Sequence, residues 1–150
     1  MGERLVTHSG VAHPWLCDVM GHLNTRHYMA AFDDVGMHTL TALGFDFAEA
    51  QRGTFGWADV QVKLDLKAEI PLGELFQVES AILRIGGSSL TIRHTMSGVK
   101  DGAVEAVADV ISVHFDLQKR KSAPVPEAIR DRAAALLITQ APNEEGQVRC

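Results

Sequence analysis

Cysteine, clustered positive charge and long apolar runs are all scarce in this sequence. Its 150 residues include two cysteines, Cys17 and Cys150, which stand alone without the spacing of a disulfide framework. We therefore expect free thiols and a reducing compartment. The opening "MGERLVTHSG" lacks the apolar core of a secretory signal, and no run reaches the roughly 18 apolar residues of a membrane span. These absences predict a cytoplasmic protein without a membrane span.

Acidic residues outnumber basic ones, which argues against a general nucleic-acid binder. With 19 Asp and Glu against 14 Lys and Arg the formal net charge is -5, whereas such binders present a basic face to phosphates. The 46% apolar and 22% charged shares are those of an ordinary globular chain. We expect one domain over residues 1–150, with a core at about 4–140 and a polar tail from Pro142.

Hydrophobic periodicity divides the chain into strands and two helices. Helical spacing begins at Thr25, with Asn24 as a suitable N-cap and Gly44 as a suitable terminator. A second helix is predicted over 127–138, opened by Pro126. Alternation of apolar and polar residues predicts strands at 5–11, 57–67, 75–85, 90–99 and 104–117. In the 57–67 strand, one face is predicted to carry Val60, Val62, Leu64 and Leu66, and the other Asp59, Gln61, Lys63, Asp65 and Lys67.

This order of elements predicts an α+β fold in which a sheet wraps around one helix. The chain reads as a strand, a long helix, a four-strand meander and a terminal helix. The apolar stripe of the long helix is buried only if the sheet covers it. The 104–117 strand is apolar on both faces and is expected inside the sheet. Uncovered sheet edges and an uncovered outer face predict pairing with a second copy.

The stretch "CDVMGHLNTRHY", residues 17–28, holds more polar chemistry than a plain connection needs. Asp18 is suited either to accept backbone N–H bonds in a turn or to act on a substrate. Cys17, His22 and His27 are ligand types that zinc accepts. They surround the start of a helix without needing to converge, and no fourth ligand is nearby, so we predict no metal.

Five residues of this stretch follow the pattern D-x-x-G-H-x-N-x-x-x-Y, namely Asp18, Gly21, His22, Asn24 and Tyr28. Five further short segments, most of them at turns or connections, also belong to the pattern: "LGF" at 43–45, P-x-G-E at 71–74, "SSL" at 88–90, "DG" at 101–102 and "RKSAPVPEAIR" at 120–130. Together these features resemble the hotdog-fold acyl-CoA thioesterases of the 4-hydroxybenzoyl-CoA thioesterase type, over nearly all of residues 4–135. The resemblance implies an antiparallel sheet of about five strands around one long central helix, plus a C-terminal helix. It also implies a homodimer or a homotetramer built as a dimer of dimers.

The resemblance implies chemistry for the start of the long helix. Asp18 would serve as nucleophile or general base on a thioester carbonyl, and the backbone amide of Thr25 would polarise that carbonyl. Such an amide lacks an intrahelical acceptor and carries the positive end of the helix dipole. His22 either orients Asp18, contacts the thioester or is a partly exposed loop residue. Asn24 caps the helix and is also a candidate for direct substrate contact.

Three more residues are candidates for substrate binding. Gly21 would act through a positive φ or close approach of the ligand. Tyr28 lies on the apolar stripe, where core packing is the default, and Trp57 of "FGWADV" could line the acyl pocket or belong to the core. Asp33, inside the helix, matches a position where the family often carries an acid. Its simplest interpretation is a solvated or interface residue rather than a catalytic one.

These features predict an acyl-CoA thioesterase that releases free acid and coenzyme A and needs no cofactor beyond the coenzyme of its substrate. One alternative is a non-catalytic acyl-CoA-binding module with the same cleft. Another is a thioesterase for short, betaine-like acyl groups of the carnitine pathway, which the motif also resembles. A hotdog dehydratase ranks last, because it requires a histidine opposite a helical acid and His22 precedes the helix.

Overall fold

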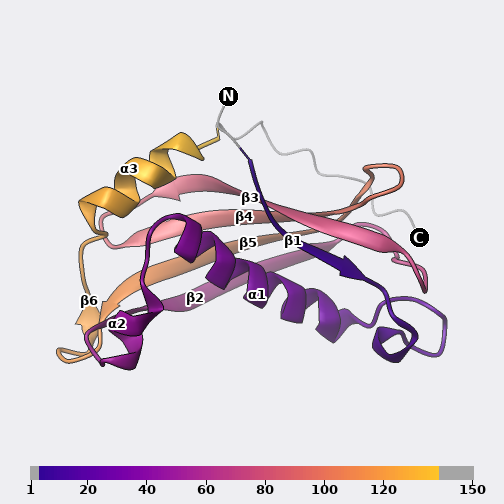
Figure 1. Cartoon of the computed structure of the whole chain (residues 1–150), viewed down its shortest axis with the longest axis horizontal. Helices are drawn as coiled ribbons and strands as arrows, with labels where there is room; N and C mark the ends of the chain where they lie inside the picture. The colour runs from indigo at the N-terminus through magenta and orange to yellow at the C-terminus, as the bar shows by residue number, and fades with distance from the viewer. Residues whose placement is uncertain (1–3, 139–150) are drawn as a thin grey trace.

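The fold is a curled antiparallel sheet that wraps one long helix, seen in a computed structural model that describes residues 4–138 (Figure 1). The predicted polar tail from Pro142 lies outside the described residues. The strands are β1 (Leu5–Val11), β2 (Phe55–Leu66), β3 (Leu75–Ile85), β4 (Ser89–Gly98), β5 (Val104–Asp116) and β6 (Lys121–Ser122). The helices are α1 (Thr25–Ala42), α2 (Phe47–Gln51), α3 (Glu127–Ala135) and the 3-10 turn η1 (Pro14–Leu16). The predicted hotdog α+β architecture is confirmed.

The order of strands in the sheet corrects one prediction. The sheet runs β1-β3-β4-β5-β2, with β6 paired to the end of β5. The predicted four-strand meander is therefore wrong, because β2 pairs with β5 rather than with β3. The segment "IPLGE" at 70–74 is predicted to be a turn between neighbouring strands, but it belongs to a connection over residues 67–74 that carries the chain from the edge strand β2 to β3 near the other edge of the sheet. The prediction of β5 as an inner strand is confirmed, since it lies between β4 and β2.

The apolar face of α1 packs on the concave face of the sheet. Its first half, around Tyr28, Phe32 and Val35, joins one buried cluster, and its last turn at Leu40 joins a second. The sheet side of the first cluster includes Val78, Met96, Ala106 and Ala108, and that of the second includes Ile82, Leu90 and Ile92, with Ile129 of α3 packed against them. Burying each such large side chain contributes about 1.5–3 kcal/mol. This packing fixes where the two ends of α1 lie.

A polar network inside the core ties α1 to β3 and β4. Thr39 Oγ1 donates to the carbonyl of Val35 at 2.8 Å and lies 3.1 Å from Ser80 Oγ. Ser80 Oγ lies 2.7 Å from His94 Nδ1. Burial lowers the pKa of His94 to about 4, so its imidazole is neutral near pH 7. Each of these three side chains thus has a partner, which avoids the cost of burying its polar atoms without a hydrogen bond.

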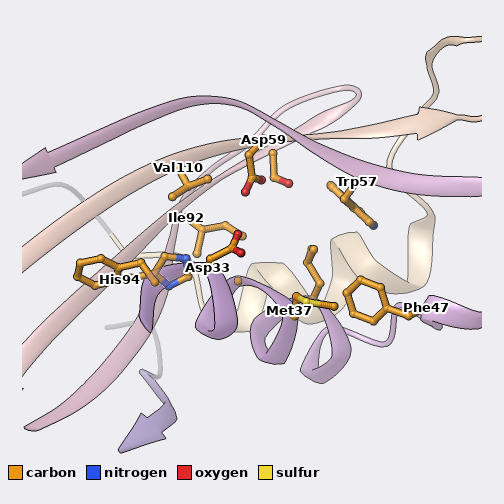
Figure 2. Close-up of a pocket in the computed structure, with 12 residues that line it drawn as sticks. Asp33, Met37, Phe47, Trp57, Asp59, Ile92, His94 and Val110 are labelled. Carbon is orange, nitrogen blue, oxygen red and sulfur yellow. The ribbon is translucent and has the colours of Figure 1, made fainter. Parts of the chain in front are cut away.

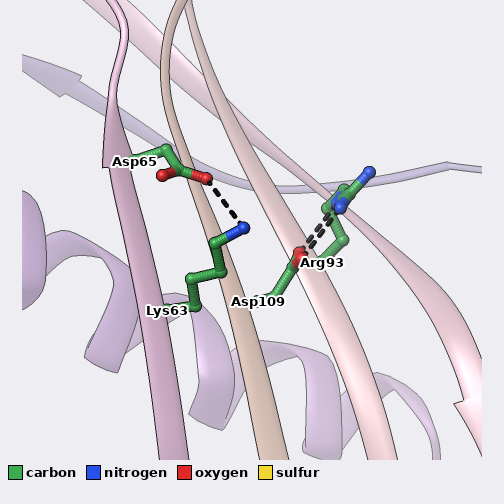
Figure 3. A network of polar contacts seen from close by, with 4 residues as sticks. All are labelled: Lys63, Asp65, Arg93 and Asp109. Atoms are coloured by element: carbon green, nitrogen blue, oxygen red, sulfur yellow. Dashed lines mark hydrogen bonds and ion pairs between the residues drawn. The ribbon is translucent and has the colours of Figure 1, made fainter. Parts of the chain in front are cut away.

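The convex face of the sheet carries a band of charged side chains across β2, β5 and β4, which lie side by side (Figure 3). Arg93 on β4 donates twice to the Asp109 carboxylate on β5, at 2.7 and 2.8 Å. On β2, Lys63 Nζ lies 3.7 Å from Asp65 Oδ2. The bidentate geometry of the Arg93 pair makes it the stronger of the two contacts.

Both predicted ends of α1 are confirmed. Asn24 precedes the helix and its side chain accepts from the Arg26 N–H at 3.4 Å. Gly44 follows the helix with φ +99°, in the left-handed region that favours glycine.

The carboxyl of Glu105, at the start of β5, is almost fully buried at 3% exposure. Burial, followed by a hydrogen bond and charge repulsion from Glu74, raises the pKa of Glu105 to about 8 from its usual 4.5. Because the folded pKa lies above the unfolded one, the folded state holds an extra proton between these pH values. The stability contribution is present below about pH 4.5 and is lost as the pH rises to about 8.

Replacing Gly44 with alanine is expected to destabilise the fold by about 1–2 kcal/mol, because a Cβ is strained at positive φ. The new Cβ would also meet the Arg132 guanidinium. Gly36→Ala is the control: Gly36 lies mid-helix with nothing within 4 Å of an added Cβ, so alanine should stabilise by about 1 kcal/mol. Urea unfolding followed by circular dichroism measures both. A Gly44→Ala protein as stable as wild type would contradict the capping role.

A second prediction concerns pH. In the Glu105→Gln variant, the loss of stability between about pH 4.5 and 8 attributed to Glu105 should disappear. Urea midpoints of wild type and variant, taken at half-unit pH steps, measure the difference. Parallel pH profiles for the two proteins would show that Glu105 ionises normally.

Candidate active site

The predicted loop forms a tight turn at the N-terminal end of α1. Cys17 pairs with Leu23 across the turn, and the Asp18 N–H donates to the carbonyl of His22 at 2.8 Å. Gly21 adopts φ +80°, which meets the predicted backbone role. The turn rests on the 70–74 segment, where the Leu23 N–H donates to the Ile70 carbonyl at 2.8 Å. A network of backbone hydrogen bonds therefore holds the loop in place.

Asp18 uses one carboxylate oxygen for the turn and leaves the other free. Its Oδ1 accepts from the Met20 N–H at 2.9 Å and from the His22 N–H at 3.4 Å. No residue of the described chain makes a hydrogen bond or ion pair to Oδ2. The two roles considered for Asp18 are thus compatible, because the bonds that orient the carboxylate spare an oxygen for chemistry.

The start of α1 presents an unused donor close to this loop in sequence. The Asn24 side chain takes the Arg26 N–H, and the Asn24 carbonyl takes the His27 N–H at 2.9 Å. Within residues 4–138, the Thr25 N–H has no acceptor. A free amide at the N-terminus of an 18-residue helix is suited to hold a developing oxyanion.

His22 and Tyr28 have different surroundings. His22 Nε2 lies 3.3 Å from Glu69 Oε2, while His22 Nδ1 is buried without a partner in the described residues. Tyr28 is 4% exposed and belongs to the core cluster beneath the loop. Burial, and then the charge of Glu105, raise the pKa of Tyr28 to about 12, so the phenol stays protonated.

Between residues 4 and 138, no three His, Cys, Asp or Glu side chains are grouped as a metal site requires.

A second candidate region is a cavity of about 260 Å³ between α1 and the inner face of the sheet (Figure 2). An apolar cavity of about 150 Å³ holds benzene, so this one has room for a substituted ring or a short branched chain. It is lined by Phe32, Asp33, Gly36, Met37, Leu40, Phe47, Trp57, Asp59, Ile92, His94, Val110 and Ser112. Gly36 leaves open space where a side chain would otherwise stand.

A β-bulge in β2 turns an acid toward this cavity. Asp59 pairs with Ser112 and Gln61 with the next residue, Ile111, so Val60 is the extra residue. The bulge reverses the alternation, and Asp59 shares the inner face with Trp57. The prediction that Asp59 lies on the face of Gln61 is therefore wrong. Sequence analysis missed Asp59 because a bulge leaves no mark in a period-two pattern.

Trp57 lies in the cavity wall, far along α1 from the loop. It packs against Phe45 and His114, and its Nε1 is buried with no partner in the described chain. Asp18 and Thr25 are not among the cavity-lining residues. Because α1 spans 18 residues at about 1.5 Å each, about 27 Å separates its two ends. One protomer therefore brings the loop residues together but leaves Trp57 apart from them.

Comparisons with known proteins agree with this fold. A family model described as the thioesterase-like superfamily matches residues 12–133. The chain is similar in structure to the hypothetical protein SAV2348 from Staphylococcus aureus, solved in complex with CoA, with TM-score 0.83, 17% identity, and 98% and 96% of the two chains covered. No curated protein sequence matches the chain.

Two further solved structures are similar. Slr0204, a 1,4-dihydroxy-2-naphthoyl-CoA thioesterase from Synechocystis, aligns with TM-score 0.77 and 16% identity over 88% of this chain and 96% of its own. BH1999, a gentisyl-coenzyme A thioesterase, aligns with TM-score 0.72 and 20% identity over 84% and 98%. Since the family model spans most of the chain, the protein belongs to the thioesterase-like superfamily and is a hotdog-fold enzyme of the thioester-hydrolase class.

Proposed function

We propose that this protein is an acyl-CoA thioesterase in which Asp18 and the Thr25 amide act on the thioester carbonyl. The observation that carries the proposal is that the turn before α1 and the start of α1 hold both a free carboxylate oxygen, on Asp18, and a free helix N-terminal N–H, on Thr25. A carbonyl carbon needs a nucleophile or an activated water, and its oxygen needs a donor as negative charge develops.

Two mechanisms of thioester hydrolysis are compatible with these two groups. As nucleophile, Asp18 Oδ2 bonds to the carbonyl carbon, the C–S bond breaks, and water then hydrolyses the mixed anhydride. As general base, Asp18 takes a proton from the water that attacks the carbon directly. In both, the Thr25 N–H donates to the oxyanion and the coenzyme leaves as a thiolate. Asn24 orients that amide through the cap, and the unpartnered His22 Nδ1 is a further candidate for contact with the reacting groups.

The Asp18→Asn variant should retain the fold, and its kcat should be lower than that of the wild type by a factor of about 10²–10⁴, the usual contribution of a positioned acid–base group. Asp34→Asn is the matched control, because Asp34 is an exposed acid on α1. Thiol release from a panel of acyl-CoA thioesters measures both. Full turnover by the Asp18→Asn protein would contradict the role of Asp18. A single turnover in H₂¹⁸O that leaves ¹⁸O in the Asp18 side chain would establish the nucleophilic route with water attacking the Asp18 carbonyl carbon of the anhydride, because the general-base route places ¹⁸O only in the product acid.

The active unit is proposed to be a homodimer joined along β2. In the described chain, the outer edge of β2 has no strand partner. Exposed apolar side chains lie along this edge and on the adjoining turn of α1: Met37 at 52%, Val60 at 62%, Val62 at 41% and Leu66 at 41% exposure. Edges of this kind favour pairing with another chain.

This dimer accounts for the distance between Trp57 and Asp18. Antiparallel pairing of two β2 strands about a twofold axis places the first half of one strand beside the last half of the other. Trp57 lies in the first half of β2, and the loop rests on the segment that follows its last residue. Each complete site would then combine the loop of one protomer with the cavity of its partner.

Complementation tests the shared site. Asp18→Asn removes the carboxylate, and Gly36→Leu fills the cavity, so each variant alone should be nearly inactive. Random mixing should restore about a quarter of wild-type turnover, because half of the dimers are mixed and each has one intact site of two. No recovery, with dimer exchange verified by mass spectrometry, would contradict a site shared between protomers.

Other activities are distinguished by the same thioester panel. A non-catalytic acyl-CoA module would bind intact thioester without releasing thiol. The solved relatives that act on dihydroxynaphthoyl-CoA and gentisyl-CoA support testing hydroxylated aromatic acyl groups. The betaine-like alternative is tested by including thioesters of short cationic acyl groups in the panel. The structural relative in complex with CoA supports coenzyme A as part of the ligand.

No helix in the described chain is long and apolar enough to cross a membrane, and a cytoplasmic location stays a prediction.

A further inference from the structure

Three acidic side chains meet beside Gly98, at the end of β4. A Cβ added to Gly98 would lie 2.8 Å from Glu74 Oε1 and 2.9 Å from both Asp101 Oδ1 and Glu105 Oε1, so the three oxygens surround the space that a side chain would fill. Glu105 is 3% exposed, and its Oε2 has no hydrogen-bond partner in the described chain. None of the ion pairs within residues 4–138 involves these three acids. Glu105 is therefore buried against other acids without a cation to neutralise it.

A β-bulge in β5 turns Glu105 into this space. Met96 pairs with Ala106 and Ser97 pairs with Val104, so Glu105 is the extra residue of β5. Glu105 and its neighbour Ala106 are both buried, as expected where a bulge interrupts the alternation of faces. A neutral side chain would fill the same place without the cost of burying a carboxyl group. Packing alone therefore does not explain an acid at this position.

Glu105 and Glu74 stand at the two ends of the connection between β2 and β3, residues 67–74. At one end, the Glu105 carbonyl accepts from the N–H groups of Lys67 and Ala68, at 2.8 and 3.1 Å. At the other end, Glu74 is the last residue before β3. The contact between the two carboxyl groups therefore joins both ends of the connection.

The middle of this connection holds the turn that contains Asp18. The Leu23 N–H donates to the Ile70 carbonyl at 2.8 Å, and the Leu72 N–H donates to the Gly21 carbonyl at 2.9 Å. A shift of the connection is transmitted to the Asp18 carboxylate through these two bonds. Displacing a catalytic group by about 1 Å can reduce the rate by about a hundredfold, so a small shift is sufficient to affect turnover.

We infer that Glu105 is a positioning residue of this enzyme, which holds the connection, and through it the Asp18 turn, in the active arrangement by sharing a proton with Glu74. The inference rests on the proposed thioesterase function. Protonated Glu105 donates to the Glu74 carboxylate, whereas loss of the proton leaves two facing anions with Asp101 as a third. Their repulsion then displaces Glu74 and the connection that ends at it.

The proton on Glu105 is held at neutral pH and lost at mildly alkaline pH. Burial, and then the hydrogen bond and charge of Glu74, raise the pKa of Glu105 to about 8, and the charge of Asp101 acts in the same direction. Tyr28 faces the cluster from α1, and burial, followed by the charge of Glu105, raises its pKa to about 12. Glu69 of the connection also raises the pKa of Tyr28. The phenol therefore stays neutral in the range where Glu105 loses its proton.

The experiment compares the pH dependence of kcat in the wild type and in Glu105→Gln, by thiol release corrected for spontaneous hydrolysis. The glutamine amide still donates to Glu74 but cannot ionise. Wild-type kcat should fall about tenfold between about pH 7 and pH 9, because pH 9 is about one unit above the pKa of Glu105, and the variant should show no such fall. Glu79→Gln is the matched control, since Glu79 is a partly buried acid of β3 paired with Arg4, and it should keep the wild-type profile.

Hydrogen exchange followed by mass spectrometry locates the change in the chain. At about pH 9, residues 17–24 and 67–74 should take up deuterium faster in the wild type than in Glu105→Gln, because the connection is displaced only where Glu105 ionises. At about pH 6.5 the two proteins should match. Peptides from α3 should match at both pH values.

The outcomes separate this inference from the proposed function. Parallel kcat profiles for the wild type and Glu105→Gln would overturn the inference and leave the thioesterase intact. Equal deuterium uptake by residues 17–24 in the two proteins at alkaline pH would also overturn it, as would a difference that extends to α3, which indicates a general loss of stability. If no thioester is cleaved, the proposed function fails, and hydrogen exchange still decides whether Glu105 holds the Asp18 turn.

Discussion

Burial of the apolar face of α1 against the concave sheet is the constraint on which the rest of this structure depends. Both core clusters contain α1 residues, and the sheet curls so that its inner side chains meet the helix along most of its length. The same packing holds the two ends of α1 apart. The N-terminal end carries the Asp18 loop and the free Thr25 amide, and the cavity runs along the middle and later turns of the helix, from Phe32 to Leu40. A rigid helix keeps the loop apart from Trp57, and this separation is the reason for the proposed dimer.

Polar groups inside the protein fall into two kinds, and the contrast between them locates ligand chemistry. Thr39, Ser80 and His94 form a closed network that joins helix and sheet and leaves the imidazole neutral. Ser112 and Trp57, a short way along the same inner face, have polar atoms without partners. A stability role explains the first group, because satisfied buried polar groups specify one packing. It does not explain the second, which borders the cavity.

Local interactions explain why much of the fold was predictable. The limits of β1 and β3 and both ends of α1 follow from alternation, the Asn24 cap and the glycine at 44, and the structure has them where the sequence places them. The pairing of β2 was not predictable in this way, since "IPLGE" resembles an ordinary turn and strand partners are chosen across the whole sheet. The small helix α2 and the strand β6 are too short to leave a periodic pattern.

The candidate site divides along the same line. Its loop is determined by the sequence itself, because Asp18, Gly21 and Asn24 act through backbone bonds to residues a few positions away. The cavity was decided only by tertiary structure. Asp59 faces it because of a bulge in strand pairing, Asp33 because of the rotation of α1 against the sheet, and Ser112 because β5 lies beside β2. Short-range hydrogen bonds can be inferred from neighbouring residues, whereas the direction of a side chain in a sheet depends on a register that distant residues set.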